Sequence, residues 1–536
     1  MSEPNENRYE GRAREGFFPS GVARSRGRIG FQLFVLLAVA AFFRFFELGL
    51  KPPHFDEGIN GHFVMTIWRD GFYSYDPTNF HGPLYFYLCQ LAEIICGRSV
   101  ESFRMMNAVI SVAVVYTAFQ FRRFVGPAAM WAAWFIALSP AFTFYGRYAI
   151  HETLFIFGQM LFVYGRFAWM GRPSRASMIW MAVGSVILIS TKETFFIFFG
   201  TWLIAELVIS LIERFEAKKR SWINASAVTP IERREIRIDS VACVGLSLLV
   251  LAALFSGFFE HTQGIEDFFR AFKFWSNTGK VGNGHQKAWT YWLELAGQYE
   301  IPLLMGLVVA PFSTILLSVE GRKQRLLLLA GFGHWLAYTI VPYKTPWLIL
   351  NFWPLAFFSL SYFDRAIGRP RVARFVHRLV LFGVCVYSAW VSWNLNFHAY
   401  ADASEPYVYV QTTTDYTKVM NVLKAKVARS PEARNSSIVV MVKDPWPMPY
   451  DLSLYPKMRY ARLEDLGKDP SILKNADMIL IDGNYLEGLQ KVFPKKFGRM
   501  SFQLRDAYDA GWALFDYDKF QVVLPTDVDV EEAATK

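Results

Sequence analysis

Apolar runs recur along most of the chain, and short charged segments separate them. Because a bilayer crossing needs about 20 mostly apolar residues, each sufficiently long run predicts one transmembrane helix. The runs lie near 31–50, 103–121, 126–143, 152–170, 177–191, 194–212, 239–257, 300–318, 325–342, 346–363 and 378–396. This pattern predicts an α-helical polytopic membrane protein with about eleven transmembrane helices.

The first run follows a basic tail and in that respect looks like a signal peptide. It lacks a small-residue cleavage site, however, and it contains Arg44. We therefore expect residues 1–30 to be a cytoplasmic tail and the run 31–50 to be an uncleaved first helix.

Residues 82–97 form a further apolar run, and whether they cross the bilayer decides the topology. If they cross, the pair Arg122-Arg123 lies outside. If they lie along the outer surface instead, the basic loops all fall in the cytoplasm, as the positive-inside rule favours. These loops contain Arg122-Arg123, Arg172 and Arg175, Lys218 to Arg234, Arg322 to Arg325, and Arg365 to Arg378. We therefore predict a juxtamembrane helix at 82–97, within a first outer loop at 51–102 of a multi-pass protein of the plasma (inner) membrane.

The composition agrees with a membrane protein and argues against other classes. The 536 residues are 53% hydrophobic and 17% aromatic, more than is usual in a soluble protein. The formal net charge is +10, but the basic residues gather in short loops, so we expect no nucleic-acid partner. The cysteines have neither metal-ligand spacing nor the pattern of a disulfide framework. They are Cys89, Cys96, Cys243 and Cys385.

Beyond about residue 398 the pattern changes to that of a soluble domain. Ser437–Lys443 and Met478–Asp482 are rich in β-branched residues and predict buried strands, whereas 414–429 predicts an amphipathic helix. No glycine-rich phosphate loop occurs there, so we assign no nucleotide chemistry. The predicted domains are a transmembrane catalytic domain at 31–397, an extracytoplasmic α/β domain at 398–525 and an acidic, disordered tail at 526–536.

Two adjacent carboxylates, Asp56 and Glu57, follow the first predicted helix. Charges at a membrane exit are costly near hydrocarbon and seldom needed for anchoring, so they indicate a functional site. A carboxylate here can remove a proton from an attacking hydroxyl or help to hold a divalent cation. The structural alternative is that Asp56 caps an interfacial helix that runs from Glu57 to Arg69.

The predicted threading brings further charges to the same outer face. Arg147 and Glu152 lie between two predicted helices and could bind a phosphate and orient an acceptor or a cation. Their alternatives are a lipid-headgroup contact for Arg147 and a helix-dipole interaction for Glu152. Lys192 and Lys344 interrupt apolar stretches and could stabilise a leaving phosphate, or could simply extend to the membrane surface.

Several histidines also map to this face, and His54 could hold a metal beside Asp56 or Glu152. Their spacing matches no specific ligand pattern, so a structural role is favoured for any single one. His81 and His151 are candidates for binding the substrate phosphate, although His81-Gly-Pro83 could be only a helix start. The cofactor stays open, with a divalent cation as one candidate.

Three segments together resemble the GT-C superfamily of membrane glycosyltransferases, which take sugars from polyprenyl phosphate. These segments are His54-Phe-Asp-Glu57, His81-Gly-Pro-Leu84 with Arg104 at the start of the next predicted helix, and Arg147-Tyr-Ala-Ile-His-Glu152. The pattern is similar to protein O-mannosyltransferases and lipid A aminoarabinose transferases. It looks closest to a bacterial and archaeal group labelled flippase-activity-associated, in which a Lys-x-Pro-Trp-Leu element, here Lys344 to Leu348, also occurs. The resemblance covers roughly residues 30–360.

The resemblance implies a GT-C fold with Asp56 as the catalytic base and Glu57 as its partner. It places Arg147 and Glu152 in an acidic motif of the second outer loop, and Lys192 and Lys344 near the lipid phosphate. Tyr343 departs from the group, in which an acidic residue often precedes that lysine.

We hypothesise that the protein transfers a sugar, with inversion, from a polyprenyl-phosphate donor to an acceptor hydroxyl at the outer face of the membrane. The acceptor class, whether glycan, lipid or protein, stays open. Two alternatives also stay open: a transporter or flippase component for a lipid-linked sugar, and a non-catalytic membrane scaffold. A transporter would need charge within the bilayer and symmetric or discontinuous helices, whereas here the charges lie at the rim and no repeat is visible.

Overall fold

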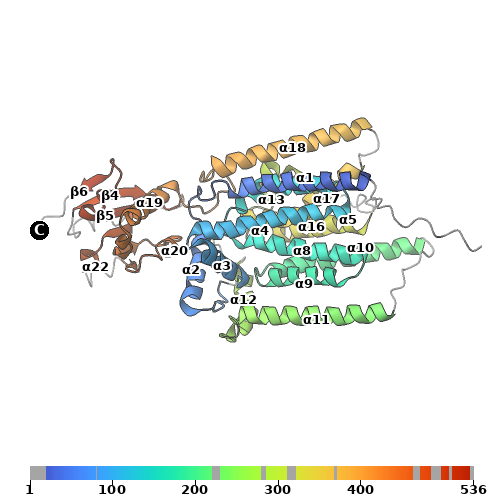
Figure 1. Cartoon of the computed structure of the whole chain (residues 1–536), viewed down its shortest axis with the longest axis horizontal. Helices are drawn as coiled ribbons and strands as arrows, with labels where there is room; N and C mark the ends of the chain where they lie inside the picture. The colour runs from blue at the N-terminus through green and yellow to red at the C-terminus, as the bar shows by residue number, and fades with distance from the viewer. Residues whose placement is uncertain are drawn as a thin grey trace, which may run out of the picture.

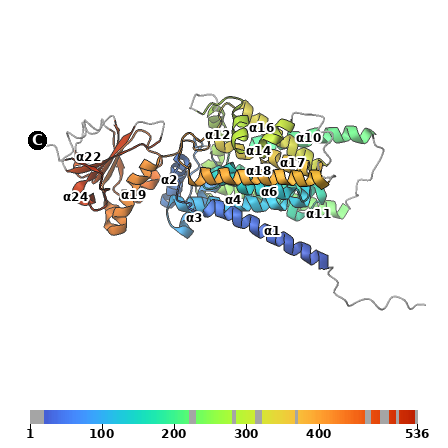
Figure 2. The same cartoon turned by 90° about the horizontal axis from the view of Figure 1, so that it is seen from above.

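A computed structural model describes residues 20–79, 81–219, 230–278, 285–310, 321–366, 371–462, 471–483, 496–505 and 510–531. A bundle of helices forms the larger part of the molecule, and a β-sheet with short helices stands beyond one end of it (Figure 1). The turned view shows the same two parts in line, with α2 (Phe55–Asp70) and α3 (Leu84–Cys96) between them (Figure 2).

All eleven predicted runs contain helix. The bundle helices are α1 (Ser20–Phe45), α4 (Val100–Gln120), α5 (Arg122–Val125), α6 (Ala129–Leu138), α7 (Pro140–Tyr145), α8 (His151–Gly171), α9 (Arg175–Ile189), α10 (Phe195–Lys219), α11 (Pro230–Phe255), α13 (Tyr291–Tyr299), α14 (Ile301–Val309), α16 (Arg322–Ile340), η1 (Pro346–Phe352), α17 (Trp353–Ala366) and α18 (Arg371–Phe397). Six helices within the described ranges are long and apolar enough to cross a membrane, so the count of eleven stays a prediction. Their apolar stretches lie at Gly27–Phe45, Val100–Val125, His151–Gly171, Phe195–Glu216, Ile236–Phe255 and Arg371–Phe397.

Two of the other runs are not single continuous α-helices. The run at 126–143 changes from α6 to α7 at Ser139-Pro140, because proline cannot donate the next helical hydrogen bond. The run at 346–363 begins as the tighter 3₁₀ helix η1 before α17 continues it.

A helix of 13 residues such as α3 spans about 20 Å, which is too short for a hydrocarbon core of about 30 Å. The juxtamembrane position of α3 stays a prediction.

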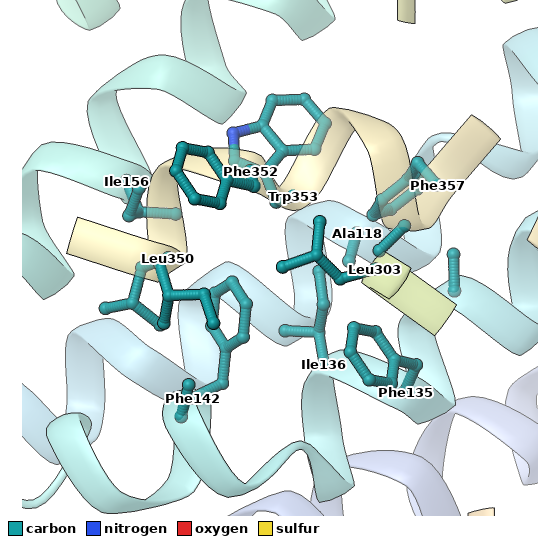
Figure 3. Packing of buried hydrophobic residues seen from close by; sticks show 14 of the residues in the cluster. Ala118, Phe135, Ile136, Phe142, Ile156, Leu303, Leu350, Phe352, Trp353 and Phe357 are labelled. Atoms are coloured by element: carbon teal, nitrogen blue, oxygen red, sulfur yellow. The ribbon is translucent and has the colours of Figure 1, made fainter. Parts of the chain in front are cut away.

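The core of the bundle is built from aromatic and branched side chains. Figure 3 shows Phe352, Trp353 and Phe357 packed over Ile136 and Leu303. Small residues let α8 and α9 approach closely, since a Cβ atom at Gly184 would lie 2.5 Å from the Phe162 nitrogen. The bundle is therefore a close-packed scaffold that can hold a site at its end.

The C-terminal α/β region, residues 398–531 where described, contains one mixed sheet in the order β2-β1-β3-β5-β4-β6. Its strands are β1 (Ile438–Met441), β2 (Arg459–Tyr460), β3 (Met478–Asp482), β4 (Phe497–Phe502), β5 (Gly511–Asp516) and β6 (Asp529–Glu531). Its helices are α19 (Thr414–Arg429), η2 (Pro431–Asn435), α20 (Met448–Asp451), α22 (Ser471–Lys474) and α24 (Tyr517–Phe520). The helix predicted at 414–429 and both predicted strands are confirmed.

One prediction about this region is wrong. Residues 526–536 were expected to be disordered, but Asp529–Glu531 forms β6 and pairs antiparallel with β4. The backbone hydrogen bonds of this pairing order a segment whose acidic composition alone favours disorder. Residues 532–536 lie outside the described residues.

Candidate functional site

A cavity of about 830 Å³ lies at the end of the bundle that faces the C-terminal α/β region. Its wall combines α2, the segment before α3, the start of α8, the α9–α10 connection, α12 (Gln263–Thr278), the segment 338–348 and parts of the C-terminal region. Segments that are hundreds of residues apart thus share one space. The side chains that line it include Asp56, His81, His151, Glu152 and Lys192.

Asp56 reaches the cavity because another residue caps α2. The His54 Nδ1 atom accepts a hydrogen bond of 3.1 Å from the backbone N–H of Asp56, and its Nε2 atom donates to the Tyr409 carbonyl at 2.8 Å. The alternative prediction that Asp56 is the cap is therefore wrong. Its carboxylate, 35% exposed, lies 4.0 Å from the His54 ring and lines the cavity wall.

Glu57 does not line the cavity but holds neighbouring segments together. Its carboxylate is fully buried and accepts two hydrogen bonds from Arg104, at 2.8 and 2.6 Å. It also accepts the backbone N–H groups of His54 and Ala149, at 2.8 and 2.9 Å. Burial favours the neutral acid, but Arg104 and these N–H groups outweigh it and hold the pKa of Glu57 below its ordinary value. Glu57 thus joins α2 to α4 and to the segment before α8.

Two ion pairs form the bundle side of the cavity. Lys192 pairs with Glu152, the second residue of α8, and the Nδ1 atom of His81 lies 2.9 Å from Glu193. Burial alone would lower the pKa of Lys192, but Glu152 and Glu193 raise it above its ordinary value. Burial likewise opposes ionisation of Glu193, but His81 and Lys192 hold its pKa low. The lysine is therefore a fixed, buried cation on the cavity wall.

His81 and His151 are also brought together, with ring centroids 4.6 Å apart. His151 is buried at the start of α8 and lines the cavity beside Glu152. Both histidines therefore line the cavity, and their role in binding a substrate phosphate stays a prediction.

Two predicted phosphate ligands lie outside the cavity wall. The Arg147 guanidinium donates to the carbonyls of Phe43, Phe46 and Glu47, and so satisfies the C-terminal end of α1. The Lys344 ammonium group donates to the carbonyls of Val341 and Lys287, at 2.8 and 3.3 Å. In this arrangement both cations are engaged with the backbone and do not meet the cavity.

The residues named as metal candidates do not converge on a site. Within the described parts of the chain, no group of three or more His, Cys, Asp or Glu side chains is placed to hold a metal ion. His54 uses both ring nitrogens in hydrogen bonds, so it is not available as a ligand here. Asp56 and Glu152 both line the cavity, but Glu152 is paired with Lys192.

Sequence reasoning missed many residues of the wall, among them His285, Tyr409, Asp444 and Arg505. None of them belongs to a spaced motif, and each reaches the cavity only through tertiary packing. The two prolines of Asp444-Pro-Trp-Pro447 mark the end of the predicted strand at 437–443, but they do not single out Asp444.

Comparison with known proteins finds likeness at the level of structure alone. No protein-family model matches the chain, and no curated protein matches its sequence. The structure of ArnT from Cupriavidus metallidurans bound to undecaprenyl phosphate is similar, with a TM-score of 0.55 at 11% identity, covering 91% of this chain and 98% of that one. The apo form of the same ArnT gives a TM-score of 0.55 at 12% identity, covering 95% and 100%.

A third solved structure, the arabinofuranosyltransferase AftD from Mycobacteria, has a TM-score of 0.46 at 12% identity, covering 92% of this chain and 40% of that one. ArnT is an aminoarabinose transferase of the GT-C type. The match to ArnT extends over most of both chains, through the bundle and beyond it. The chain therefore has the fold of the GT-C membrane glycosyltransferases.

Proposed function

We propose that the protein is an integral-membrane glycosyltransferase that moves a sugar from a polyprenyl-phosphate donor to an acceptor hydroxyl. The observation that carries this proposal is the composition of the cavity, in which the partly exposed carboxylate of Asp56 shares a wall with the buried cation Lys192 and with apolar side chains. The similar fold of ArnT, which binds undecaprenyl phosphate, supports a lipid-linked donor.

The apolar part of the wall suits a prenyl chain. Ile197, Trp275 and Val341 line the cavity at α10, α12 and the end of α16. Their neighbours Phe196 and Ile340 are exposed on the bundle surface, to 37% and 73%, as residues that face lipid are. A chain that lies along this side would bring its phosphate to Lys192 and His81, with the sugar extending toward Asp56.

The chemistry that this arrangement supports is a single displacement. Asp56 accepts the proton of the acceptor hydroxyl, and the hydroxyl oxygen forms a bond to the anomeric carbon. The bond from that carbon to the phosphate oxygen breaks, and its electron pair leaves with polyprenyl phosphate. Lys192 and His81 stabilise the negative charge of this leaving group. One displacement inverts the anomeric centre, whereas retention would need a second nucleophilic step.

Tyr343 also lines the cavity. Its phenol is within electrostatic range of Lys192, Asp56 and Glu152, and burial raises its pKa above the ordinary value. It is therefore a neutral hydroxyl that can hydrogen-bond the sugar or the phosphate. Glu57 acts by positioning α2, and Arg147 and Lys344 take no step in this scheme.

We place this end of the bundle on the extracytoplasmic side of the plasma membrane. The basic segments that favour the cytoplasm, including Arg322 and Arg325 at the start of α16, belong to the opposite end of the bundle. The C-terminal α/β region then lies outside, above the cavity.

The direct test uses two aspartates of the same helix. Purified protein in nanodiscs is supplied with a panel of undecaprenyl-phosphate sugars and acceptors, and released undecaprenyl phosphate is measured. Asp56→Asn is expected to lower release by about 100-fold or more, because general-base catalysis typically contributes that much. Asp70→Asn, at the exposed far end of α2, serves as the control and should keep full activity. Release by Asp56→Asn at the wild-type rate contradicts the assignment, as does a wild type that releases nothing from any donor.

A further inference from the structure

The C-terminal α/β region supplies part of the cavity wall, through Asp444 and Arg505. Asp444 lies just after β1, and Arg505 lies just after β4. Both therefore approach the cavity from the side opposite to Lys192 and the membrane bundle, next to the start of α2. This placement assigns the two residues to the half of the site that a donor lipid does not occupy.

Arg505 is locked in place by several contacts. Its guanidinium donates to the Trp446 carbonyl at 2.6 Å, to the Asp444 carbonyl at 3.1 Å and to the Asp444 carboxylate at 2.7 Å. It also lies over the Phe55 ring, 4.9 Å from the centroid, and its side chain is only 3% exposed. Since Phe55 directly precedes Asp56, Arg505 fixes the position of Asp444 relative to the proposed base.

The segment that follows Asp444 is packed against α2 without room for side chains. A Cβ atom at Gly58 would lie 2.4 Å from the Cα of Pro447, and one at Gly61 would lie 2.2 Å from the ring of Tyr450. The Tyr450 ring also stacks on Phe103, with centroids 5.0 Å apart. The C-terminal region is thus held rigidly on the helix that carries Asp56.

The Asp444 side chain is 32% exposed, far more than that of its partner Arg505. A carboxylate only accepts hydrogen bonds, so it selects ligands that present several hydroxyl donors. Asp56 lines the same cavity, and Arg505, the cation beside Asp444, is already paired with it, whereas Lys192 and His81 belong to the bundle side proposed for the donor phosphate. An acceptor that carried a carboxylate or phosphate of its own would be repelled from this side.

We propose that Asp444 binds the hydroxyl groups of a neutral carbohydrate acceptor and that Arg505 positions Asp444 for this task. The C-terminal α/β region then selects the acceptor, while the bundle binds the donor. This inference rests on the proposed function, because it presumes that an acceptor hydroxyl approaches Asp56.

The test measures sugar binding without requiring turnover. Saturation-transfer NMR is recorded on the protein in nanodiscs with methyl glucoside, methyl galactoside and methyl mannoside, and with the matched glucuronide and galacturonide. At least one neutral glycoside is expected to bind, and the matched uronide is expected to bind more weakly. Asp444→Ala should weaken binding about tenfold or more, as loss of a hydrogen bond to a charged group does. Asp518→Ala, an exposed aspartate of α24 outside the cavity wall, should bind like the wild type.

Two further measurements distinguish this inference from the proposed function. Arg505→Lys keeps the charge but loses the planar fork, so it should weaken glycoside binding while the retention of undecaprenyl phosphate, followed by native mass spectrometry, stays unchanged. A wild type that retains no undecaprenyl phosphate contradicts the proposed function instead. The inference on Asp444 is overturned if no neutral glycoside binds, if uronides bind equally well, or if Asp444→Ala binds the glycoside as the wild type does.

Discussion

Replacing Glu57 by glutamine should destabilise the protein strongly, although the neighbouring Asp56→Asn should not. The Glu57 carboxylate accepts four hydrogen bonds, two of them from the fully buried Arg104. A glutamine amide offers one oxygen in place of two, so at least one of these donors would face an N–H₂ group. Removing one partner of a buried ion pair typically costs about 3–5 kcal/mol.

The structure places the expected loss near the lower end of that range. Arg104 also donates to the carbonyls of Leu48, Lys51 and Pro52, and these would still solvate its charge after the substitution. We therefore expect Glu57→Gln to lower the free energy of unfolding by about 3 kcal/mol. Asp56, which is partly exposed and is not in such a network, should contribute less than about 1 kcal/mol.

The assay is equilibrium unfolding of the purified protein in mixed micelles, with SDS as denaturant and tryptophan fluorescence as the signal. Because Arg104 lowers the folded-state pKa of Glu57, its stabilisation is present at neutral pH and is lost only as the pH falls below the ordinary value of 4.5. The difference between wild type and Glu57→Gln should shrink over that acidic range. A Glu57→Gln protein within 1 kcal/mol of wild type at pH 7, or equal losses for the two substitutions, would refute this reasoning.

Three further substitutions test other contacts. Gly61→Ala places a methyl group against the Tyr450 ring and should cost about 1–3 kcal/mol in the same unfolding assay, whereas Gly200→Ala, in open space on α10, should be neutral or slightly stabilising. Lys192→Met should weaken retention of undecaprenyl phosphate in native mass spectrometry by about tenfold, and equal retention would exclude Lys192 from the phosphate site. Burial raises the pKa of Asp451 from 3.8 to about 6, so the folded state loses stability as the pH rises through this interval. Asp451→Asn should therefore match wild type near pH 3.5 and exceed it by about 3 kcal/mol at pH 7.5, and a gain at low pH alone would show the opposite sign.

The bundle could be predicted from the sequence because hydrocarbon demands long apolar helices, and their runs are visible without any tertiary information. Pro140 was visible in the sequence, but the apolar run around it was predicted as one transmembrane helix, because the run alone does not show where the helix is interrupted. In the C-terminal region, the β-branched composition of 438–441 and 478–482 predicted two strands, whereas β6 depends on pairing with β4 and leaves no local signal.

The candidate site was predictable where charge interrupts apolar sequence. Asp56, Glu152 and Lys192 stand out because charged groups are rare beside membrane spans, and the structure brings all three to one cavity. The same signal also marked Arg147 and Glu57, whose charges have structural roles. The sequence alone cannot show whether a charge meets a ligand, a backbone carbonyl or another side chain. Asp444 carries no comparable signal, because an aspartate in a soluble region is ordinary.

The position of a bound polyprenyl phosphate tests the central claim most directly. A density map of the protein in nanodiscs with undecaprenyl phosphate should show the phosphate in the cavity, within hydrogen-bonding distance of Lys192, with its chain against Ile197 and Val341. Asp56 should face the phosphate across the space that a sugar would fill. A lipid phosphate at the opposite end of the bundle, or on its outer surface away from Asp56, would contradict the account.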